Sequence, residues 1–190
     1  MSISSAFSRC LSPIILQQNR SLFYWINLQF NALDIDRIKK LGPDRTCAEW
    51  ILRNGGSVKF MNFTEYSSDY NELPPEETIV KLKEVDASNT NIMHCGFEHF
   101  KDCKYIDTLI FHKCFYVNDE ALISLHYLKS SLKKLKVSSC PSVTDKGVSS
   151  LAGLKHLSSL NLCELQSVQK LDETIEKLKS SLPNCKVDCT

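Results

Sequence analysis

The feature that most constrains this chain is a short pattern that recurs at nearly constant spacing. In its clearest copy, residues 132–151, two alternating apolar residues are followed by a cysteine, helix-capping residues and an apolar helical face. The same order occurs in residues 106–125; residues 157–168 repeat the apolar positions with Leu165 in place of the cysteine, and a weaker copy lies around residue 85. The first strand positions of the four copies lie 24, 26 and 25 residues apart and are Val85, Leu109, Leu135 and Leu160.

A period of this length predicts a repeat architecture. Units of roughly 20–29 residues are typical of leucine-rich-repeat proteins, in which each unit adds a strand to a curved sheet and a helix to its other side. We therefore expect an α/β fold: a short, right-handed leucine-rich-repeat solenoid of about four repeats, of the cysteine-containing type. The alternative is an ordinary α/β domain with evenly spaced strands. It is disfavoured because spacing, cysteine and cap agree in at least two copies.

The strand positions between the apolar ones are expected to face away from the helices. Such a concave sheet face is the usual docking surface of short solenoids. A longer helix over residues 172–181 and an edge strand over residues 185–189 are expected to close the far end. The side chains expected on the open face are Lys83, Asp86, Thr108, Ile110, Lys134, Lys136, Ser159 and Asn161.

Residues 21–57 do not carry the repeat and are predicted to form a helical capping domain in front of the repeat region, residues 58–190. Apolar residues at helical spacing predict one or two helices up to residue 41, and Gly42-Pro43 ends them before a second helical run. A solenoid exposes an apolar end unless something covers it. The outer face of this cap has mixed charge, which is usual for a solvated face. The residues there that we consider for partner binding are Asp36, Arg37, Asp44, Arg45 and Arg53.

Residues 1–20 have the composition of a mitochondrial transit peptide. The segment is rich in serine, contains no acidic residue and carries only two charged residues, Arg9 and Arg20. Its apolar run at residues 14–16 is too short for a secretory signal. We expect cleavage shortly after Arg20; a disordered tail is the alternative.

The composition excludes several other classes of protein. The net charge of +1 argues against a dedicated nucleic-acid binder. No apolar run approaches the roughly 20 residues needed to span a bilayer. The nine cysteines are odd in number and include no Cys-x-x-Cys pair, so a reducing compartment fits better than a secreted disulfide scaffold.

Residue sets that carry chemistry are scarce. His112 and Cys114 could form a metal or thiol–base pair, but Cys114 occupies the buried repeat position, and no further ligands follow at metal-like spacing. His94, Cys95 and His99 are interpreted as surface and core residues. The sequence shows no phosphate-binding glycine loop and no nucleophile elbow. We therefore expect a protein that binds other proteins, with no catalytic residues and no small-molecule substrate.

Several segments resemble the coupling factor B family, also called subunit s of mitochondrial ATP synthase. The closest is residues 23–56, FYWINLQFNALDIDRIKKLGPDRTCAEWILRNGG, in which the string GPDR-x-x-x-EW is fairly specific. Further matches are DYNELP at residues 69–74, DAS at 86–88, IMHCGFEH at 92–99 and SCPSVTDKG at 139–147. The resemblance covers essentially everything after the predicted transit peptide.

The resemblance implies a matrix-side, peripheral protein of the mitochondrial inner membrane. Its implied partners are membrane-sector subunits of ATP synthase, where the family supports coupled proton conduction. It also implies a Mg²⁺ site made by the backbone carbonyls of Gly55 and Ser88, and carbonyl ligands suit such a hard cation. This chain has His112-Lys113-Cys114 where the family has Cys-x-Cys, so the resemblance carries no dithiol chemistry over to it.

Two other functions remain open at this point. A related repeat family assists assembly of the distal membrane arm of respiratory complex I, and it would share compartment and fold. Cysteine-containing repeats also occur in F-box ubiquitin-ligase adaptors, although no F-box precedes them here. The identity of the binding partner distinguishes the three.

Overall fold

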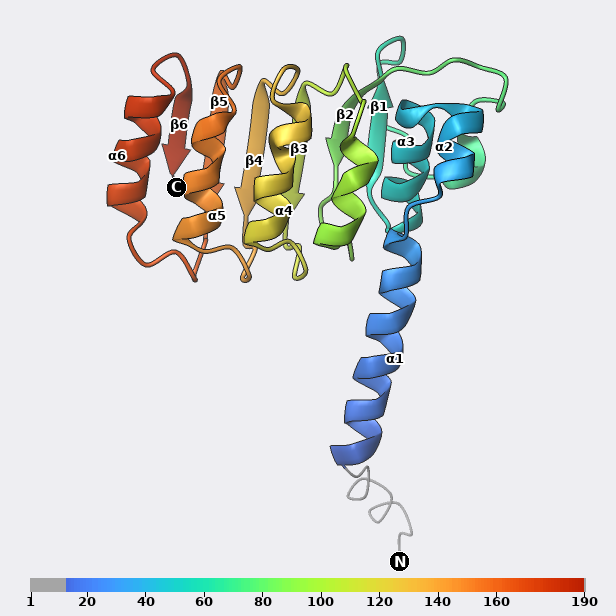
Figure 1. The fold of residues 1–190 in the computed structure, drawn as a ribbon, viewed down its shortest axis with the longest axis horizontal. Coiled ribbons are helices and arrows are strands. Elements are labelled where there is room, and N and C mark those ends of the chain that lie inside the picture. Colours follow the sequence, from blue (N-terminus) through green and yellow to red (C-terminus); the bar gives the residue numbers. More distant parts are fainter. Residues whose placement is uncertain (1–12, 190) are drawn as a thin grey trace, which may run out of the picture.

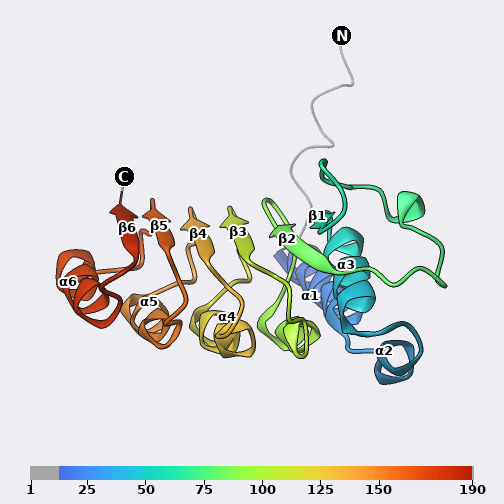
Figure 2. The same cartoon turned by 90° about the horizontal axis from the view of Figure 1, so that it is seen from above.

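The computed structural model describes residues 13–189, and of residues 13–21 the backbone only. Its centre is a six-stranded sheet in the order β1 to β6. Figure 1 shows the strands in sequence along the molecule, and Figure 2 shows the helices gathered on one side of the strand row. The strands are β1 (Ser57–Phe60), β2 (Leu82–Asp86), β3 (Thr108–His112), β4 (Lys134–Ser138), β5 (Ser159–Cys163) and β6 (Lys186–Cys189).

The helices alternate with the strands after the first part of the chain. Short 3-10 helices continue α4 and α5 and replace an α-helix after β2. The α-helices are α1 (Pro13–Asn31), α2 (Ile35–Leu41), α3 (Pro43–Arg53), α4 (Asp119–Ser124), α5 (Asp145–Ser150) and α6 (Leu171–Ser181). The 3-10 helices are η1 (Tyr70–Glu72), η2 (His94–Phe100), η3 (Leu125–Leu128) and η4 (Leu151–Gly153).

The predicted strand positions lie side by side in the sheet. Val85 pairs with Leu109, Leu109 with Leu135, and Leu135 with Leu160, all between parallel strands. These four side chains are buried and form part of one hydrophobic core that runs through all the units. The α/β class and the predicted strand spacing are thereby confirmed. The strand β1 differs from the others because it pairs with β2 in the antiparallel direction.

One predicted strand position was wrong. Glu84 pairs with Thr108 and Asp86 with Ile110, so Glu84 and not the predicted Lys83 lies on the open face beside Asp86. Side chains alternate along a strand, and the neighbours of buried Val85 therefore share the opposite face. A register irregularity at Lys59–Phe60 shifts the pairing of the residues before Glu84.

Polar side chains at the start of each helix join one unit to the next. Asn118 caps α4 and Thr144 caps α5 by accepting from backbone N–H groups, as capping residues do. The residues after these caps, Asp119 and Asp145, bond to backbone groups of the following unit. The carboxylate of Asp119 accepts from the Thr144 N–H at 2.8 Å, and that of Asp145 accepts from the Lys170 N–H at 2.9 Å. Each acidic side chain therefore fixes the helix entry of the following unit.

A second set of repeated hydrogen bonds runs along the turns that follow the strands. Four residues in these turns have a left-handed backbone, with φ between 51° and 58°: Lys113, Ser139 and Glu164 directly follow β3, β4 and β5, and Asn89 lies three residues after the end of β2. They lie 24, 26 and 25 residues apart, the same spacing as the strands. In the first three, the N–H donates to the last carbonyl of the neighbouring strand at 2.8–3.0 Å. The turns are thus held in a fixed row.

The N-terminal helices cover the β1 end of the sheet. The predicted helical run up to residue 41 is two helices, because Asp34 caps α2 after a break at residues 32–34. Gly42, with φ of 83°, separates α2 from α3 as predicted. Figure 1 shows α1 extending well away from the sheet. The transit peptide predicted for residues 1–20 lies largely outside the described residues, and α1 begins within its last part.

Candidate functional site

The open face of the sheet is the first candidate surface. Its side chains form two columns across successive strands, because the register places equivalent positions next to one another. The first column is Glu84, Thr108, Lys134, Ser159 and Lys186, and the second is Asp86, Ile110, Lys136, Asn161 and Asp188. Seven of the eight residues predicted for this face are therefore found on it.

Charge is distributed unevenly over this open face. Glu84 near the front accepts from the Tyr66 hydroxyl at 2.8 Å and pairs with Lys59 at 3.4 Å. Burial opposes ionisation of Glu84, but these donors outweigh it, and its pKa is lowered. Lys134 and Lys136 in the middle are exposed and form no ion pair with any described residue. The middle of the face is thus a basic surface open to an acidic partner.

The helical cap is organised around one buried carboxylate. The side chain of Glu49 is only 2% exposed and receives Arg37 at 2.6 Å, Arg45 at 3.1 Å and Arg53 at 3.7 Å. Burial would raise the pKa of Glu49, but the hydrogen bonds and charges of Arg37 and Arg45 lower it overall. A buried carboxylate of this kind is tolerable only because it is paired and hydrogen-bonded.

The residues predicted to bind a partner on the cap are therefore engaged within the chain to different degrees. Arg45 is buried and also donates to the Pro74 carbonyl, and the carboxylate of Asp44 accepts from the Leu82 N–H at 2.8 Å. Arg37 also contacts Glu76 at 3.0 Å. Arg53 and Asp36 are the most exposed of the five, at 44% and 96% of their side chains. A partner-binding role for any of these residues stays a prediction.

A hydrogen-bond centre that the sequence did not reveal fastens α1 to the first unit. The Asn31 Oδ1 accepts from the Trp50 indole at 3.1 Å and from the Met93 N–H at 2.8 Å. Its Nδ2 donates to the Asn27 and Asn91 carbonyls at 2.8 and 3.1 Å. Every hydrogen-bonding group of this buried amide is used. One asparagine has no periodic signal, so only the three-dimensional structure shows this role.

His99 packs at the same contact between the end of α1 and the first unit. Its ring stacks on Trp50 with centroids 5.1 Å apart, and Nε2 lies 3.3 Å from the Ala32 carbonyl. Among the described residues, Nδ1 is buried with no hydrogen-bond partner. Burial lowers the pKa of His99 to about 4, and the charge of Arg53 lowers it further while the Ala32 carbonyl opposes the shift. The imidazole is therefore neutral near pH 7.

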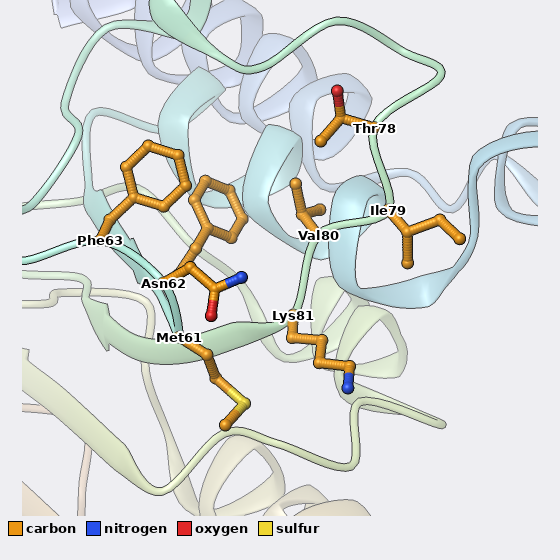
Figure 3. A pocket seen from close by; sticks show the side chains of 8 residues that line it. Met61, Asn62, Phe63, Thr78, Ile79, Val80 and Lys81 are labelled. Atoms are coloured by element: carbon orange, nitrogen blue, oxygen red, sulfur yellow. The ribbon is translucent and has the colours of Figure 1, made fainter.

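Two exposed apolar surfaces lie near the ends of the β1 region. On α1 the exposed large side chains are Leu22, Phe23, Tyr24, Trp25 and Phe30. The other surface surrounds a small cavity of about 190 Å³ lined by residues from two segments, 60–63 and 78–81. Figure 3 shows Ile79 pointing away from that cavity, and this side chain is 92% exposed.

The structure gives the side chains of His112 and Cys114, considered from the sequence as a metal or thiol–base pair, different hydrogen-bond partners. The His112 Nδ1 lies 2.8 Å from the Ser138 hydroxyl, whereas the buried Cys114 thiol donates to the backbone carbonyls of Ala87 at 2.9 Å and His112 at 3.6 Å. Cys114 and Cys140 hold equivalent buried positions in neighbouring units, and a hydrogen bond from Cys140 lowers the pKa of Cys114 against the effect of burial. The described residues contain no cluster of three His, Cys, Asp or Glu side chains suited to a metal.

The implied Mg²⁺ ligands can be compared with the backbone. Gly55 has φ of 86°, and the next residue packs so closely that a Cβ on Gly56 would lie 2.8 Å from the Asp86 carbonyl. The Gly55 and Ser88 segments are therefore neighbours. Among the described residues, neither carbonyl oxygen receives a hydrogen bond. Backbone carbonyl oxygens of this kind are ligands that a hard cation accepts, and a Mg²⁺ site at Gly55 and Ser88 stays a prediction.

Taken together, these features define an α/β protein of stacked strand–turn–helix units with a helical cap and an open, polar sheet face. Within the described range, no helix is long and apolar enough to cross a bilayer. The chain belongs to the family of mitochondrial ATP synthase subunit s, as the comparison with known proteins shows.

The similarity extends over most of both chains. The chain is 35% identical over 173 residues to "ATP synthase subunit s, mitochondrial" of Bos taurus, covering 88% of this chain and 86% of that protein. It is 33% identical over 171 residues to the Homo sapiens protein of the same name, covering 87% and 85%. For Mus musculus the identity is 32% over 170 residues. No protein-family model matches the chain.

Proposed function

We propose that this chain is a non-catalytic, protein-binding subunit of mitochondrial ATP synthase that supports coupled proton conduction by the membrane sector. The observation that carries the proposal is the 33–35% identity to proteins named as subunit s over about 87% of the chain. The open sheet face supports it, because polar side chains in fixed columns provide a rigid surface for another protein. The expected site is mitochondrial, peripheral on the matrix side of the inner membrane.

The architecture itself is proposed to be a right-handed leucine-rich-repeat solenoid with an N-terminal helical cap. Support comes from the strand spacing, from the equivalent buried positions of Cys114 and Cys140, and from the row of left-handed turn residues. Each of these features recurs at the same interval along the chain. In such an array each unit contacts its neighbours, and a covered front end is required for solubility.

The proposal is tested by affinity purification of the tagged full chain from mitochondria, with identification of the recovered proteins. Recovery of ATP synthase membrane-sector subunits is expected. Recovery of complex I assembly intermediates would favour the related assembly function, and ubiquitin-ligase components would favour an adaptor. Either of those results in place of ATP synthase subunits contradicts the proposal.

Two matched variants test whether the open face of the sheet is the surface that binds ATP synthase subunits. The double substitution Lys134→Glu and Lys136→Glu reverses the exposed basic centre of the open face. Lys129→Glu with Lys170→Glu makes the same change of charge at exposed positions outside that face. The first variant is expected to lose ATP synthase subunits from the purification and the second to retain them. Equal recovery with both variants would place the contact elsewhere, for example at Arg53 on the cap.

A Mg²⁺ site at the Gly55 and Ser88 carbonyls remains part of the proposal. Each carbonyl shares a peptide plane with the amide of the following residue, so the Gly56 and Asn89 amides report on cation binding. Titration of the labelled protein with MgCl₂ is expected to shift these two amide resonances first. KCl at equal ionic strength is the control. Equal shifts with both salts would remove the site from the proposal and leave the protein-binding function untouched.

A further inference from the structure

A groove crosses the turns that follow β3, β4 and β5. Its volume is about 520 Å³, and each of three successive units contributes two residues, namely Lys113, Phe115, Ser139, Pro141, Glu164 and Gln166. The turns lie at the carboxyl ends of these parallel strands, which point toward the lower edge of the molecule in Figure 1. The groove is thus separate from the columns of the open face. Its volume lies within the roughly 300–1,000 Å³ of typical ligand sites.

The walls of this groove are held in place without a ligand. The N–H groups of Lys113 and Ser139 donate to the last carbonyls of the next strands, both at 3.0 Å. The Ser142 hydroxyl donates to the Phe115 carbonyl at 2.9 Å, and the Ser167 hydroxyl donates to the Pro141 carbonyl at 2.6 Å. Each turn is therefore tied to the next. A rigid surface loses little conformational entropy when it binds, which favours affinity.

The groove has an apolar centre and opposite charges at its two ends. Phe115 is 68% exposed, and Pro141 from the next unit lies beside it in the lining. Lys113 stands at the β3 end and Glu164 at the β5 end, and both are exposed. Neither has a partner of opposite charge among the described residues; Glu164 accepts only from the Ser139 hydroxyl at 2.5 Å. An occupant must therefore offer an acid to one end, a base to the other and an apolar group between.

We propose that this groove binds an extended segment of a partner protein that carries one acidic and one basic residue three positions apart with an apolar residue between them. Lys113 and Glu164 belong to turns separated by two strand spacings. Neighbouring strands lie about 4.8 Å apart, which gives about 10 Å, and an extended chain covers that distance in about three residues. The proposal does not depend on which assembly contains the chain.

The test uses three synthetic peptides of equal length with the sequences Gly-Ser-Glu-Leu-Ser-Lys-Ser-Gly, Gly-Ser-Glu-Leu-Ser-Glu-Ser-Gly and Gly-Ser-Lys-Leu-Ser-Lys-Ser-Gly. Binding to the full chain is followed by amide resonances at low salt. The wild-type protein is expected to bind the peptide of mixed charge about 3- to 5-fold more tightly than the other two, as one exposed ion pair provides. Shifts are expected at Lys113, Phe115, Ser139 and Glu164.

Single charge reversals change the preference in a way that does not depend on the direction of the bound chain. Glu164→Lys leaves two basic ends, so the peptide with two acids becomes the tightest; Lys113→Glu leaves two acidic ends, so the peptide with two bases does. Phe115→Ser is expected to weaken all three by about 10-fold, since it removes apolar contact area. The matched control variants, Lys129→Glu and Glu72→Lys, change exposed charges elsewhere and keep the wild-type order.

Three results would overturn the proposal. The first is an absence of amide shifts in wild-type protein at millimolar peptide. The second is an order of affinities that does not change with Glu164→Lys or Lys113→Glu while their spectra remain those of a folded protein. The third is the same change of order in the control variants, because it would show a response to net charge alone.

Discussion

At the scale of single residues, the amide of Asn31 connects three segments that are far apart in the sequence. It bonds α3 through Trp50, the loop before η2 through Met93, and its own helix through Asn27. The substitution Asn31→Leu leaves the Trp50 indole N–H and the Met93 N–H without an acceptor. Each buried donor without a partner costs about 1–3 kcal/mol. For the two donors, urea unfolding is expected to show a loss of about 2–6 kcal/mol.

Gln29→Leu is the control for this substitution, because Gln29 is an exposed residue of the same helix. It is expected to change the free energy of unfolding by less than about 0.5 kcal/mol. A comparable loss in both variants would mean that the polar face of α1, and not the bonds of Asn31, supplies the stability.

His99 makes stability depend on pH in the acidic range. Its pKa is about 4 in the folded protein, below the ordinary value of 6.5, so the unfolded chain binds a proton more readily. Its contribution is fully present above about pH 6.5 and is lost as the pH falls toward 4, by about 3 kcal/mol in total. His99→Phe keeps the stacking on Trp50 and removes the titration. The difference in unfolding free energy between the two proteins, measured from pH 7 to pH 4, is expected to shrink or reverse in favour of the phenylalanine; a constant difference would exclude the effect.

At the scale of elements, Asp119 and Gly147 show how α4 and α5 are joined. A Cβ on Gly147 would lie 2.4 Å from Asp119 Oδ1, the oxygen that accepts from the Thr144 N–H. Alanine gains about 1 kcal/mol of helix propensity over glycine, but the clash and the lost bonds outweigh it. Gly147→Ala is therefore expected to lower the free energy of unfolding by about 1–3 kcal/mol.

Two comparisons test this explanation. Gly153→Ala introduces a Cβ with no atom within 4 Å, so thermal unfolding should show little change. When Asp119→Ala already removes the bonds, adding Gly147→Ala should cost much less than it does in the wild type, because the two residues act through one contact. Strictly additive losses would contradict the proposed contact.

The elements differ in how far the sequence could predict them. The strands at Leu109, Leu135 and Leu160 were predictable because buried apolar residues must recur wherever each strand meets the core. The caps at Asn118 and Thr144 follow from local backbone chemistry. The reach of Asp119 and Asp145 into the next unit was not predictable, since it depends on the packing of one turn against another.

The candidate surfaces were predicted less well than the strands. The open face followed from alternation, except that Lys83 was placed where Glu84 belongs. On the cap, helical spacing put Arg37 and Arg45 on one face, but it did not show that both point at Glu49. The charged groove at Lys113 and Glu164 comes from turn geometry, and turn geometry leaves little trace in an apolar pattern.

At the scale of the whole molecule, protection from hydrogen exchange is expected to be highest in the middle of the sheet and lowest at its β6 end. The strand β1 is covered by α3, whereas β6 has a neighbour on one side only and contains no buried residue. Local opening costs least where few apolar contacts are lost. Exchange in D₂O should therefore be fastest for amides of β6 and α6 and slowest in β3 and β4. Slower exchange in β6 than in β3 would show that the far end is covered by something not yet identified.

The reversed direction of β1 also bears on how a gene of this kind can lengthen. From β2 onward, neighbouring strands run parallel. Each strand–turn–helix unit therefore begins and ends at positions equivalent to those of the unit before it. A duplicated stretch of the gene that encodes one complete unit could be inserted at any unit boundary after β2 without changing the N-terminal helices or β1. A stretch encoding part of a unit would put every following strand out of phase. The number of strands in such a chain can therefore change only by whole units, while the spacings of 24, 26 and 25 residues show that a single unit accommodates a difference of one or two residues.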